Sequence, residues 1–260
     1  MNPPKKSLGQ HWLFDDAALD AVVAAGEVTA QDTVLEIGPG LGTLTAKLVS
    51  QAAGVVAVET DRELAAGLAA RVPATNLEVV RADILQFDLT QLPTGYKAVA
   101  NIPYYLTSKI LQYLIEADNS PTLLALLMQK EVAERVTASP GAMSVLAFSV
   151  QYYGVATIMG EIPKELFEPV PKVDSAILQV KPYPEPYFPA ERKILFRLVK
   201  AGFGERRKKL INSLAGGLQI SKAASLELVE SAGLPVTVRA QELSLGDWGR
   251  LYHSYITYLR

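Results

Sequence analysis

The stretch ANIPY places Asn101, Ile102, Pro103 and Tyr104 directly after an apolar run. Asn and Pro are poor strand residues, so the strand that this run predicts ends here. The exocyclic amine of adenine is a weak nucleophile because its lone pair is delocalised into the ring. The Asn101 side-chain oxygen and the Ile102 carbonyl could accept from that amine and localise the lone pair. Pro103 would fix the direction of the carbonyl, and Tyr104 would stack on the base, a contact worth roughly 1–3 kcal/mol.

Taken alone, this tetrapeptide is more typical of a strand-ending turn, so its chemistry depends on a cofactor site beside it. The stretch EIGPGLGT places Gly38, Gly40 and Gly42 after an earlier apolar run. Glycines there let the backbone turn sharply and approach a ligand at the N-terminus of the following helix. A tight strand-to-helix turn, with glycines for packing, is the simpler alternative.

The ligand that this loop favours is a cation rather than a pyrophosphate. A dinucleotide fingerprint needs G-x-G-x-x-G, whereas the spacing here is G-x-G-x-G and Thr43 stands at the place of the last glycine. Glu36 precedes the loop, and its carboxylate would repel a pyrophosphate. S-adenosylmethionine carries a sulfonium and no phosphate, so it matches this pattern.

Two further acids follow predicted strands. Glu59 ends the second strand, where a ribose-binding acid would lie, and Asp83 follows the third, where it could accept from an adenine amine. Asp83 alone is better explained as the cap of a helix or turn. Because strand ends line one crevice in an open α/β sheet, however, Gly38, Glu59, Asp83 and Asn101 together predict a single site.

These residues need a sheet to bring them together, and apolar runs alternate with helical patterns through the first two-thirds of the chain. This alternation predicts an α/β fold with a parallel sheet. Expected strands are 33–38, 54–60, 77–83, 97–101, 122–129, 154–162 and 174–182, and expected helices are 44–53, 61–72 and 107–117. Residues 144–154 fit either a buried helix or a strand.

A proline-rich segment, with prolines at 182, 184, 186 and 189, can be neither a regular helix nor an inner strand. It predicts a boundary between a catalytic domain at 1–183 and a helical domain at 184–260. Helical patterns continue beyond it. Residues 221–235 are an example, with Ser221 as N-cap and Gly233 after the last turn.

Composition excludes several other classes of protein. The 260 residues include no cysteine and two histidines, so no metal site is expected, and 49% hydrophobic with 20% charged residues fits a globular protein. No apolar run approaches the roughly 20 residues of a membrane span, and the N-terminus lacks the apolar core of a signal peptide. We therefore expect a cytoplasmic protein with no membrane partner.

Charge is unevenly distributed, although the formal net charge is only −2. Residues 1–180 carry a net charge of −8, and residues 181–260 carry a net charge of +6. A basic run, expected on a helix, comprises Arg206, Arg207, Lys208 and Lys209. The charges fit either two solvated surfaces of different composition or a basic domain that contacts the phosphates of a nucleic acid.

Several motifs, in this order, resemble those of the ribosomal RNA adenine N6,N6-dimethyltransferase family. They are KKSLGQHWL, EIGPGLGTLT, NIPY, FEPVPKVDSAIL and GFGERRKKLINSL, and they extend over nearly the whole chain. The resemblance implies a class I S-adenosylmethionine-dependent methyltransferase, with a Rossmann-like seven-stranded sheet and a small all-α C-terminal domain. It also implies that residues 144–153 form a helix.

The resemblance implies roles for individual residues as well. Cofactor contacts would come from Gln10, His11, Leu13, Gly38, Gly40, Glu59, Asp83, Ile84 and Asn101. The catalytic group would comprise Asn101, Ile102, Pro103, Tyr104 and Phe167. Phe167 would pack on the target base opposite Tyr104, although packing in the core explains it almost equally well. RNA contacts would come from Arg206, Arg207 and Lys208.

The family has two branches, which differ in their target. One dimethylates two adjacent adenosines near the 3′ end of small-subunit rRNA, and the other methylates one adenosine of large-subunit rRNA and confers macrolide resistance. The loop GPGLGT favours the first branch, as does Asp174 where the second tends toward Asn. Trp12 and Tyr105 depart from the commoner Phe and Asn.

The expected partner is therefore small-subunit rRNA or the immature small ribosomal subunit, bound by a monomer. Two other classes stay open at this stage. A small-molecule methyltransferase would use the same sheet, and the basic C-terminal third argues against it. A non-catalytic ribosome-assembly factor would have lost the chemistry, and the intact NIPY motif argues against that.

Overall fold

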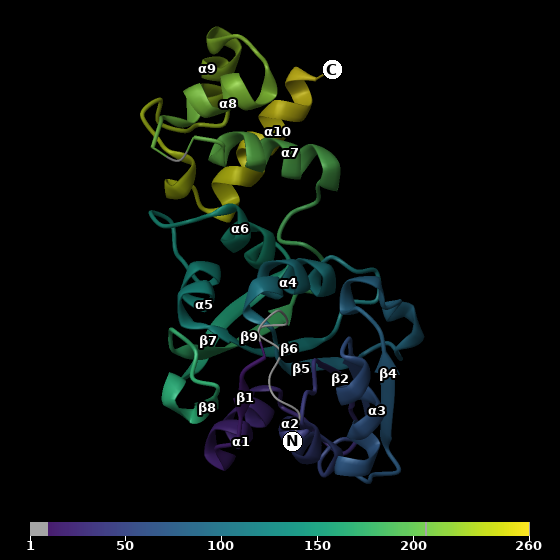
Figure 1. Ribbon diagram of the computed structural model, residues 1–260. Coiled ribbons are helices and arrows are strands. Elements are labelled where there is room, and N and C mark those ends of the chain that lie inside the picture. Colours follow the sequence, from purple (N-terminus) through teal and green to yellow (C-terminus); the bar gives the residue numbers. More distant parts are fainter. Residues whose placement is uncertain (1–9, 206, 260) are drawn as a thin grey trace. The chain divides into compact units, whose positions relative to one another are not determined.

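Seven strands pair side by side in the order β4-β3-β2-β5-β6-β9-β7 in the computed structural model, which describes residues 10–205 and 207–259 (Figure 1). Neighbouring strands from β4 to β6 are parallel, whereas β9 is antiparallel to β6. The strands are β2 (Thr33–Ile37), β3 (Gly54–Glu59), β4 (Leu77–Arg81), β5 (Lys97–Asn101), β6 (Leu123–Gln129), β7 (Gly154–Ile162) and β9 (Ser175–Pro182). The α/β fold predicted from the sequence is confirmed.

The strands form where continuous apolar runs predict them, because both faces of a central parallel strand are covered. In β6, for example, every residue from Leu123 to Met128 is buried. The four parallel strands β4, β3, β2 and β5 lie next to one another and end at the same edge of the sheet. At that edge the glycine loop follows β2. The predicted residues Glu59, Asp83 and Asn101 lie there too, at or just after the ends of β3, β4 and β5.

Helices connect the strands of this part of the chain. They are α1 (Asp16–Ala25), α2 (Thr43–Val49), α3 (Arg62–Arg71) and α4 (Thr107–Ile115), followed by α5 (Lys130–Val136). Carboxylates cap two of them: Asp15 accepts from the backbone of α1, and Asp61 accepts from two backbone N–H groups of α3. Such caps fix where a helix begins.

A second, two-stranded sheet pairs segments far apart in the sequence. In it, β1 (Trp12–Leu13) lies antiparallel to β8 (Phe167–Glu168), with Leu13 opposite Phe167. Both of these side chains are buried in one core cluster, together with residues of α1. This pairing holds the N-terminal motif against the late-sheet motif.

The remaining helices belong to a separate compact unit. They are α6 (Val145–Gln151), α7 (Arg192–Phe203), α8 (Leu210–Leu218), α9 (Lys222–Ser231) and α10 (Leu245–Tyr258). Its core contains Phe148 from α6, which packs edge-to-face on Trp248 from α10. The helix implied at 144–153 is confirmed, and α9 begins after Ser221 as predicted.

The two units divide the sequence differently from the predicted boundary. One comprises the described residues up to Glu134 with Val155–Pro182, and the other comprises Arg135–Gly154 with the residues from Tyr183 onward. The chain therefore enters the helical unit for the second time at the proline-rich segment. Residues 135–154, expected in the first domain, lie in the second because the aromatic side chains of α6 pack in its core.

No helix within the described ranges is both long enough and apolar enough to cross a membrane.

Adjacent glycines in α8 have different surroundings. A Cβ added at Gly217 would lie 2.6 Å from both Cα and Cβ of Ala201 in α7, whereas one added at Gly216 would meet no atom within 4 Å. A glycine at 217 therefore lets two helix backbones approach closely. At position 216 glycine has no such packing role, and it lowers the stability of the helix by about 1 kcal/mol relative to alanine.

We therefore predict opposite effects for two neighbouring substitutions. Gly217→Ala should lower the free energy of unfolding by about 1–3 kcal/mol, because the added methyl group meets backbone that cannot move aside. Gly216→Ala should leave it unchanged or raise it by up to about 1 kcal/mol. Urea unfolding of both variants measures this, and equal effects would refute the proposed close packing of α7 and α8.

Candidate active site

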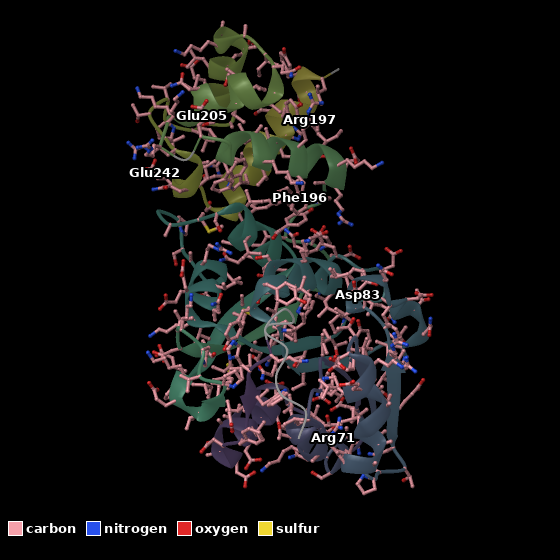
Figure 2. The ribbon with its side chains drawn as sticks, viewed as in Figure 1. Arg71, Asp83, Phe196, Arg197, Glu205 and Glu242 are labelled. Atoms are coloured by element: carbon pink, nitrogen blue, oxygen red, sulfur yellow. The ribbon has the colours of Figure 1, made fainter. Side chains whose placement is uncertain are left out.

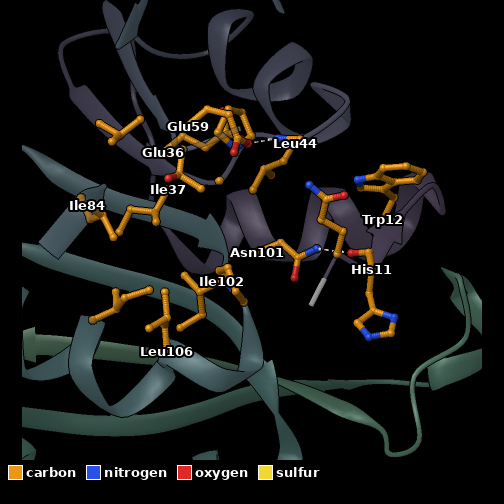
Figure 3. Close-up of a pocket in the computed structure, with 18 of the residues that line it drawn as sticks. His11, Trp12, Glu36, Ile37, Leu44, Glu59, Ile84, Asn101, Ile102 and Leu106 are labelled. Carbon is orange, nitrogen blue, oxygen red and sulfur yellow. Dashed lines mark hydrogen bonds between the residues drawn. The ribbon is translucent and has the colours of Figure 1, made fainter. Parts of the chain in front are cut away.

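A pocket opens at the edge of the sheet where β2, β3, β4 and β5 end (Figure 3). Its lining includes all nine residues that the resemblance assigns to the cofactor: Gln10, His11, Leu13, Gly38, Gly40, Glu59, Asp83, Ile84 and Asn101. Ile102, Pro103 and Tyr104 line it as well. Residues from five separate segments of the sequence therefore meet in one cavity.

The glycine loop adopts a conformation that other residues rarely reach. Gly38, Gly40 and Gly42 have φ values of 65°, 58° and 91°. A Cβ at Gly42 would lie 2.8 Å from Leu68 and from Val72, so the loop packs tightly on α3. Positive φ and close packing together require glycine at position 42.

The peptide of Gly40 is held from two directions. Its N–H donates to Glu59 Oε2 at 3.1 Å, and its carbonyl accepts from Arg71 Nη2, also at 3.1 Å. Arg71, at the end of α3 (Figure 2), donates in addition to the carbonyls of Leu41 at 3.1 Å and Leu64 at 2.7 Å. The guanidinium thereby ties the glycine loop to α3.

This guanidinium lies over Gly67, the glycine in the middle of α3. A Cβ at Gly67 would collide with Arg71 Nη1. Because glycine lowers helix stability by about 1 kcal/mol relative to alanine, its presence here needs a reason. The space that it leaves for Arg71 supplies one.

Glu59, at the end of β3, is buried and already bonded. Besides the contact with Gly40, its Oε1 accepts from the backbone N–H of Asp61 at 2.9 Å. Burial raises the pKa of Glu59, and these backbone hydrogen bonds oppose the rise. Each carboxylate oxygen has two lone pairs, so both can still accept from the hydroxyls of a ribose.

Glu36, in β2, is 1% exposed and lines the same pocket. Burial raises its pKa to about 8, while the Thr45 hydroxyl opposes the rise and the negative charge of Glu59 adds to it. A buried carboxylate in this position favours a cation, or a hydrogen-bond donor, beside it.

Asn101 ends β5, and its side chain is oriented by the N-terminal segment. Its Nδ2 donates to the backbone carbonyl of His11 at 3.1 Å (Figure 3). This contact distinguishes the two ends of the amide and leaves Oδ1 as an acceptor. Next to it, the N–H of Ile102 donates to the carbonyl of Leu127 at 3.2 Å, which anchors the backbone after the strand.

Tyr104 is fixed at its hydroxyl and on one face of its ring. The hydroxyl shares a hydrogen bond of 2.6 Å with Oγ of Ser175, a buried residue of β9. The His11 ring stacks on Tyr104 with centroids 5.5 Å apart, and His11 Nδ1 lies 2.6 Å from the carbonyl of Pro169. Burial raises the pKa of Tyr104, so its ring remains a neutral stacking surface.

Two predicted residues also have structural contacts. Phe167 is 2% exposed and packs in the core with Leu13, and it is not among the residues that line the pocket, so its stacking on a target base stays a prediction. Asp83 lines the pocket, but its Oδ1 also caps the short turn Ile84–Gln86 by accepting from the N–H of Leu85 at 3.0 Å. Its second oxygen is available for a ligand.

The predicted basic run does not lie on a helix where the structure describes it. Arg206 lies outside the described residues. Arg207 and Lys208 are exposed in the turn between α7 and α8, which begins at Leu210. Lys208 forms an ion pair with Glu205.

Sequence reasoning missed several residues around the pocket. Trp12 and Tyr105 line it, and Tyr105 is 58% exposed, but their sequence positions indicate only departures from commoner residues. Ser175 lies within the quoted motif PKVDS, but nothing in its spacing indicates Tyr104 as its partner. Within the described ranges, no group of three or more His, Asp and Glu residues could hold a metal ion.

Comparison with known proteins identifies the family. The model of a family described as ribosomal RNA adenine dimethylase matches residues 1–256. The chain belongs to this family. The chain is also similar to a ribosomal RNA small subunit methyltransferase A from Dehalococcoides mccartyi, with 39% identity over 252 residues, covering 95% of this chain and 87% of that protein.

Solved structures agree with this assignment. A dimethyladenosine transferase from Plasmodium falciparum superposes with a TM-score of 0.82 and 25% identity, covering 94% of this chain and 97% of that one. The 23S rRNA methyltransferase ErmE superposes with a TM-score of 0.75 and 27% identity, covering 94% and 98%. The class I methyltransferase fold of the family is therefore that of this chain.

Gly67 allows a test of the link between Arg71 and the loop. Gly67→Ala should displace the guanidinium and weaken binding of S-adenosylmethionine by about three- to tenfold, while α3 itself gains from alanine. Isothermal titration calorimetry measures the affinity. In an Arg71→Ala background the same Gly67→Ala change should have no further effect on binding, and a persisting loss would contradict the link.

Glu36 should make stability depend on pH in a definite direction. Its pKa lies at about 8 in the folded protein against an ordinary value of 4.5, so between these values the folded state binds its proton more tightly than the unfolded state. The tighter binding of this proton stabilises the folded state fully below a pH of 4.5, and the stabilisation is lost as the pH rises to about 8. Relative to Glu36→Gln, the unliganded protein should therefore lose stability from about pH 4.5 to pH 8. Urea unfolding at several pH values tests this, and a pH-independent difference would count against it.

Proposed function

We propose that the protein transfers methyl groups from S-adenosylmethionine to N6 of two adjacent adenosines near the 3′ end of small-subunit rRNA, giving N6,N6-dimethyladenosine. The observation that carries the proposal is the convergence of the NIPY tetrapeptide and the glycine loop in one pocket. A cofactor cradle alone would fit many methyltransferases. Asn101 and Tyr104 beside it provide a hydrogen-bond acceptor for an adenine amine and a stacking surface for the base.

The pocket fits S-adenosylmethionine on the evidence of its own atoms. The glycine loop leaves room for a ligand, Glu59 can accept from a ribose, and Asp83 with Ile84 can contact an adenine ring. Burial raises the pKa of Glu36 to about 8, and a cationic ligand beside it would favour the ionised form of this carboxyl, which a phosphate would not. The bound cofactor supplies the electrophilic methyl group.

The protein's contribution to the transfer is positioning and electrostatics. Asn101 Oδ1 and the Ile102 carbonyl accept from the adenine amine and localise its lone pair toward the methyl group. The His11 carbonyl holds the Asn101 amide in the required orientation, and Pro103, with a φ of −60°, limits movement of the Ile102 peptide. Polar groups that are already oriented need no reorganisation during the reaction.

Tyr104 provides the stacking surface for the target base. Its hydroxyl is held by Ser175, so the ring has a fixed plane. One face of the ring is covered by His11, which leaves the opposite face for the base. Taking the adenosine out of its stack costs a few kcal/mol, which this stacking offsets in part.

The RNA partner is supported by the charge of the C-terminal region. Residues 181–260 carry a net charge of +6, and phosphate contacts dominate the affinity of proteins for RNA. We assign part of these contacts to Arg207 and Lys208, which are exposed, and to Arg206. We infer that a monomer in the cytoplasm acts on the immature small subunit, with a role in its biogenesis.

A second candidate is methylation of large-subunit rRNA, which the similarity to ErmE brings forward. The sequence of the glycine loop, GPGLGT, favours the small subunit, as does the name of the relative from Dehalococcoides mccartyi. A role in ribosome assembly could accompany catalysis. A protein with that role alone would not require Asn101 Oδ1 to remain available.

Substrate identity is tested by methyl transfer from labelled S-adenosylmethionine. We predict label in undermethylated small subunits, at two adjacent adenosines near the 3′ end of the rRNA and up to two methyl groups on each. Fully methylated small subunits are the matched control and should accept none. Label confined to large subunits would move the protein to the other branch, and no transfer to any rRNA would refute the proposal.

A further inference from the structure

Tyr105 is an exposed aromatic residue on the wall of the pocket. It lies between β5 and α4, in the short turn that ends at Leu106, and it lines the pocket beside Tyr104 (Figure 3). The residue is 58% exposed. Within residues 10–205 and 207–259, its ring stacks on no other aromatic ring and its hydroxyl has no hydrogen-bond partner. Its ring is therefore free to bind a ligand.

Exposure alone does not indicate a ligand, because single exposed hydrophobic residues are normal on protein surfaces. The described residues also include the exposed aromatic residues Phe14, Tyr187 and Tyr258, which are 42%, 53% and 46% exposed. None of these three lines the pocket. Among the large hydrophobic residues that are exposed in the described ranges, Tyr105 alone lies on the pocket wall. Its ring is therefore at the opening, where a ligand that extends out of the pocket would pass.

The two neighbouring tyrosines differ in depth. Tyr104 is partly buried, with its hydroxyl bonded to Ser175 and the His11 ring on one face. A 3₁₀ turn has three residues per turn, so the next side chain points about 120° away. Tyr105 consequently reaches solvent, although its Cα lies only about 3.8 Å from that of Tyr104. One ring thus lies in the pocket and the other at its opening, one residue apart.

A ligand that uses both rings has two flat groups joined by a short link, as two successive nucleotides do. An adenosine that is taken out of its stack leaves the neighbouring base without a partner on one face. An aromatic side chain can replace that partner, and it accepts any base because every base has a π-face. S-adenosylmethionine, by contrast, carries a single adenine, which we assign to Asp83 and Ile84.

We propose that Tyr105 stacks on the nucleotide next to the target adenosine, while Tyr104 stacks on the target itself. This inference rests on the proposed function, since it presupposes an RNA substrate in this pocket. Tyr105 then positions the RNA strand at the opening of the pocket and takes no part in the methyl transfer. No bond is formed or broken in this contact, and the phenolic hydroxyl is not needed for it.

Two substitutions separate the ring of Tyr105 from its hydroxyl. Tyr105→Phe keeps the ring, and Tyr105→Leu keeps an apolar side chain without a ring. Single-turnover methyl transfer at saturating S-adenosylmethionine, over a range of undermethylated small-subunit concentrations, gives the half-saturating concentration and the maximal rate. In Tyr105→Leu the half-saturating concentration should rise at least about fivefold, as expected for the loss of one base–aromatic stack, with the maximal rate within about threefold of the wild type. In Tyr105→Phe both quantities should stay within about twofold of the wild type, because the stacking ring remains.

Tyr258→Leu is the matched control, because Tyr258 is exposed but does not line the pocket, and it should change neither quantity. Isothermal titration calorimetry with S-adenosylhomocysteine should show the same cofactor affinity in every variant, and urea unfolding checks that each is folded.

Three results overturn the inference and leave the proposed function standing. They are an unchanged half-saturating concentration in Tyr105→Leu, an equal rise in Tyr105→Phe or in the control, and weaker binding of S-adenosylhomocysteine in Tyr105→Leu. If the wild-type protein transfers no methyl group to any rRNA, the proposed function itself fails, and the inference fails with it.

Discussion

One hydrogen bond joins the two parts of the site that must act together. Asn101 Nδ2 donates to the carbonyl of His11, and so links the end of β5 to the N-terminal segment. The segment is itself held by the pairing of β1 with β8 and by the contact between His11 and Pro169. Because this bond fixes which end of the amide is free, the acceptor that we propose for a substrate amine depends on a residue 90 positions earlier in the chain.

The acidic pocket and the basic C-terminal region suit ligands of opposite charge. The pocket contains the buried acids Glu36 and Glu59. Burial raises the pKa of both, and a cationic ligand beside them would offset this cost of ionisation. The net charge of +6 in residues 181–260 suits RNA, whereas the rest of the chain is acidic. A net charge near zero for the whole chain therefore conceals two regions with opposite preferences.

The sheet and the positions of its strand ends could be predicted from sequence, because buried parallel strands appear as uninterrupted apolar runs and parallel strands end at one edge. The same logic placed Gly38, Glu59, Asp83 and Asn101 together. Contacts that depend on tertiary packing were not predictable. Tyr104 and Ser175 are 71 positions apart, and no local pattern connects them. The place of α6 was missed for the same reason, since its aromatic residues could pack in either unit until the core was known.

The most direct test of this account is the single-turnover rate of methyl transfer for Asn101→Ala, measured at saturating S-adenosylmethionine and small-subunit substrate. Affinities for both would be determined in parallel. If Asn101 Oδ1 activates the adenine amine, the rate should fall by at least about 100-fold while both affinities stay within a few-fold of the wild type. A rate within tenfold of the wild type, or a loss explained by weaker binding alone, would contradict the account.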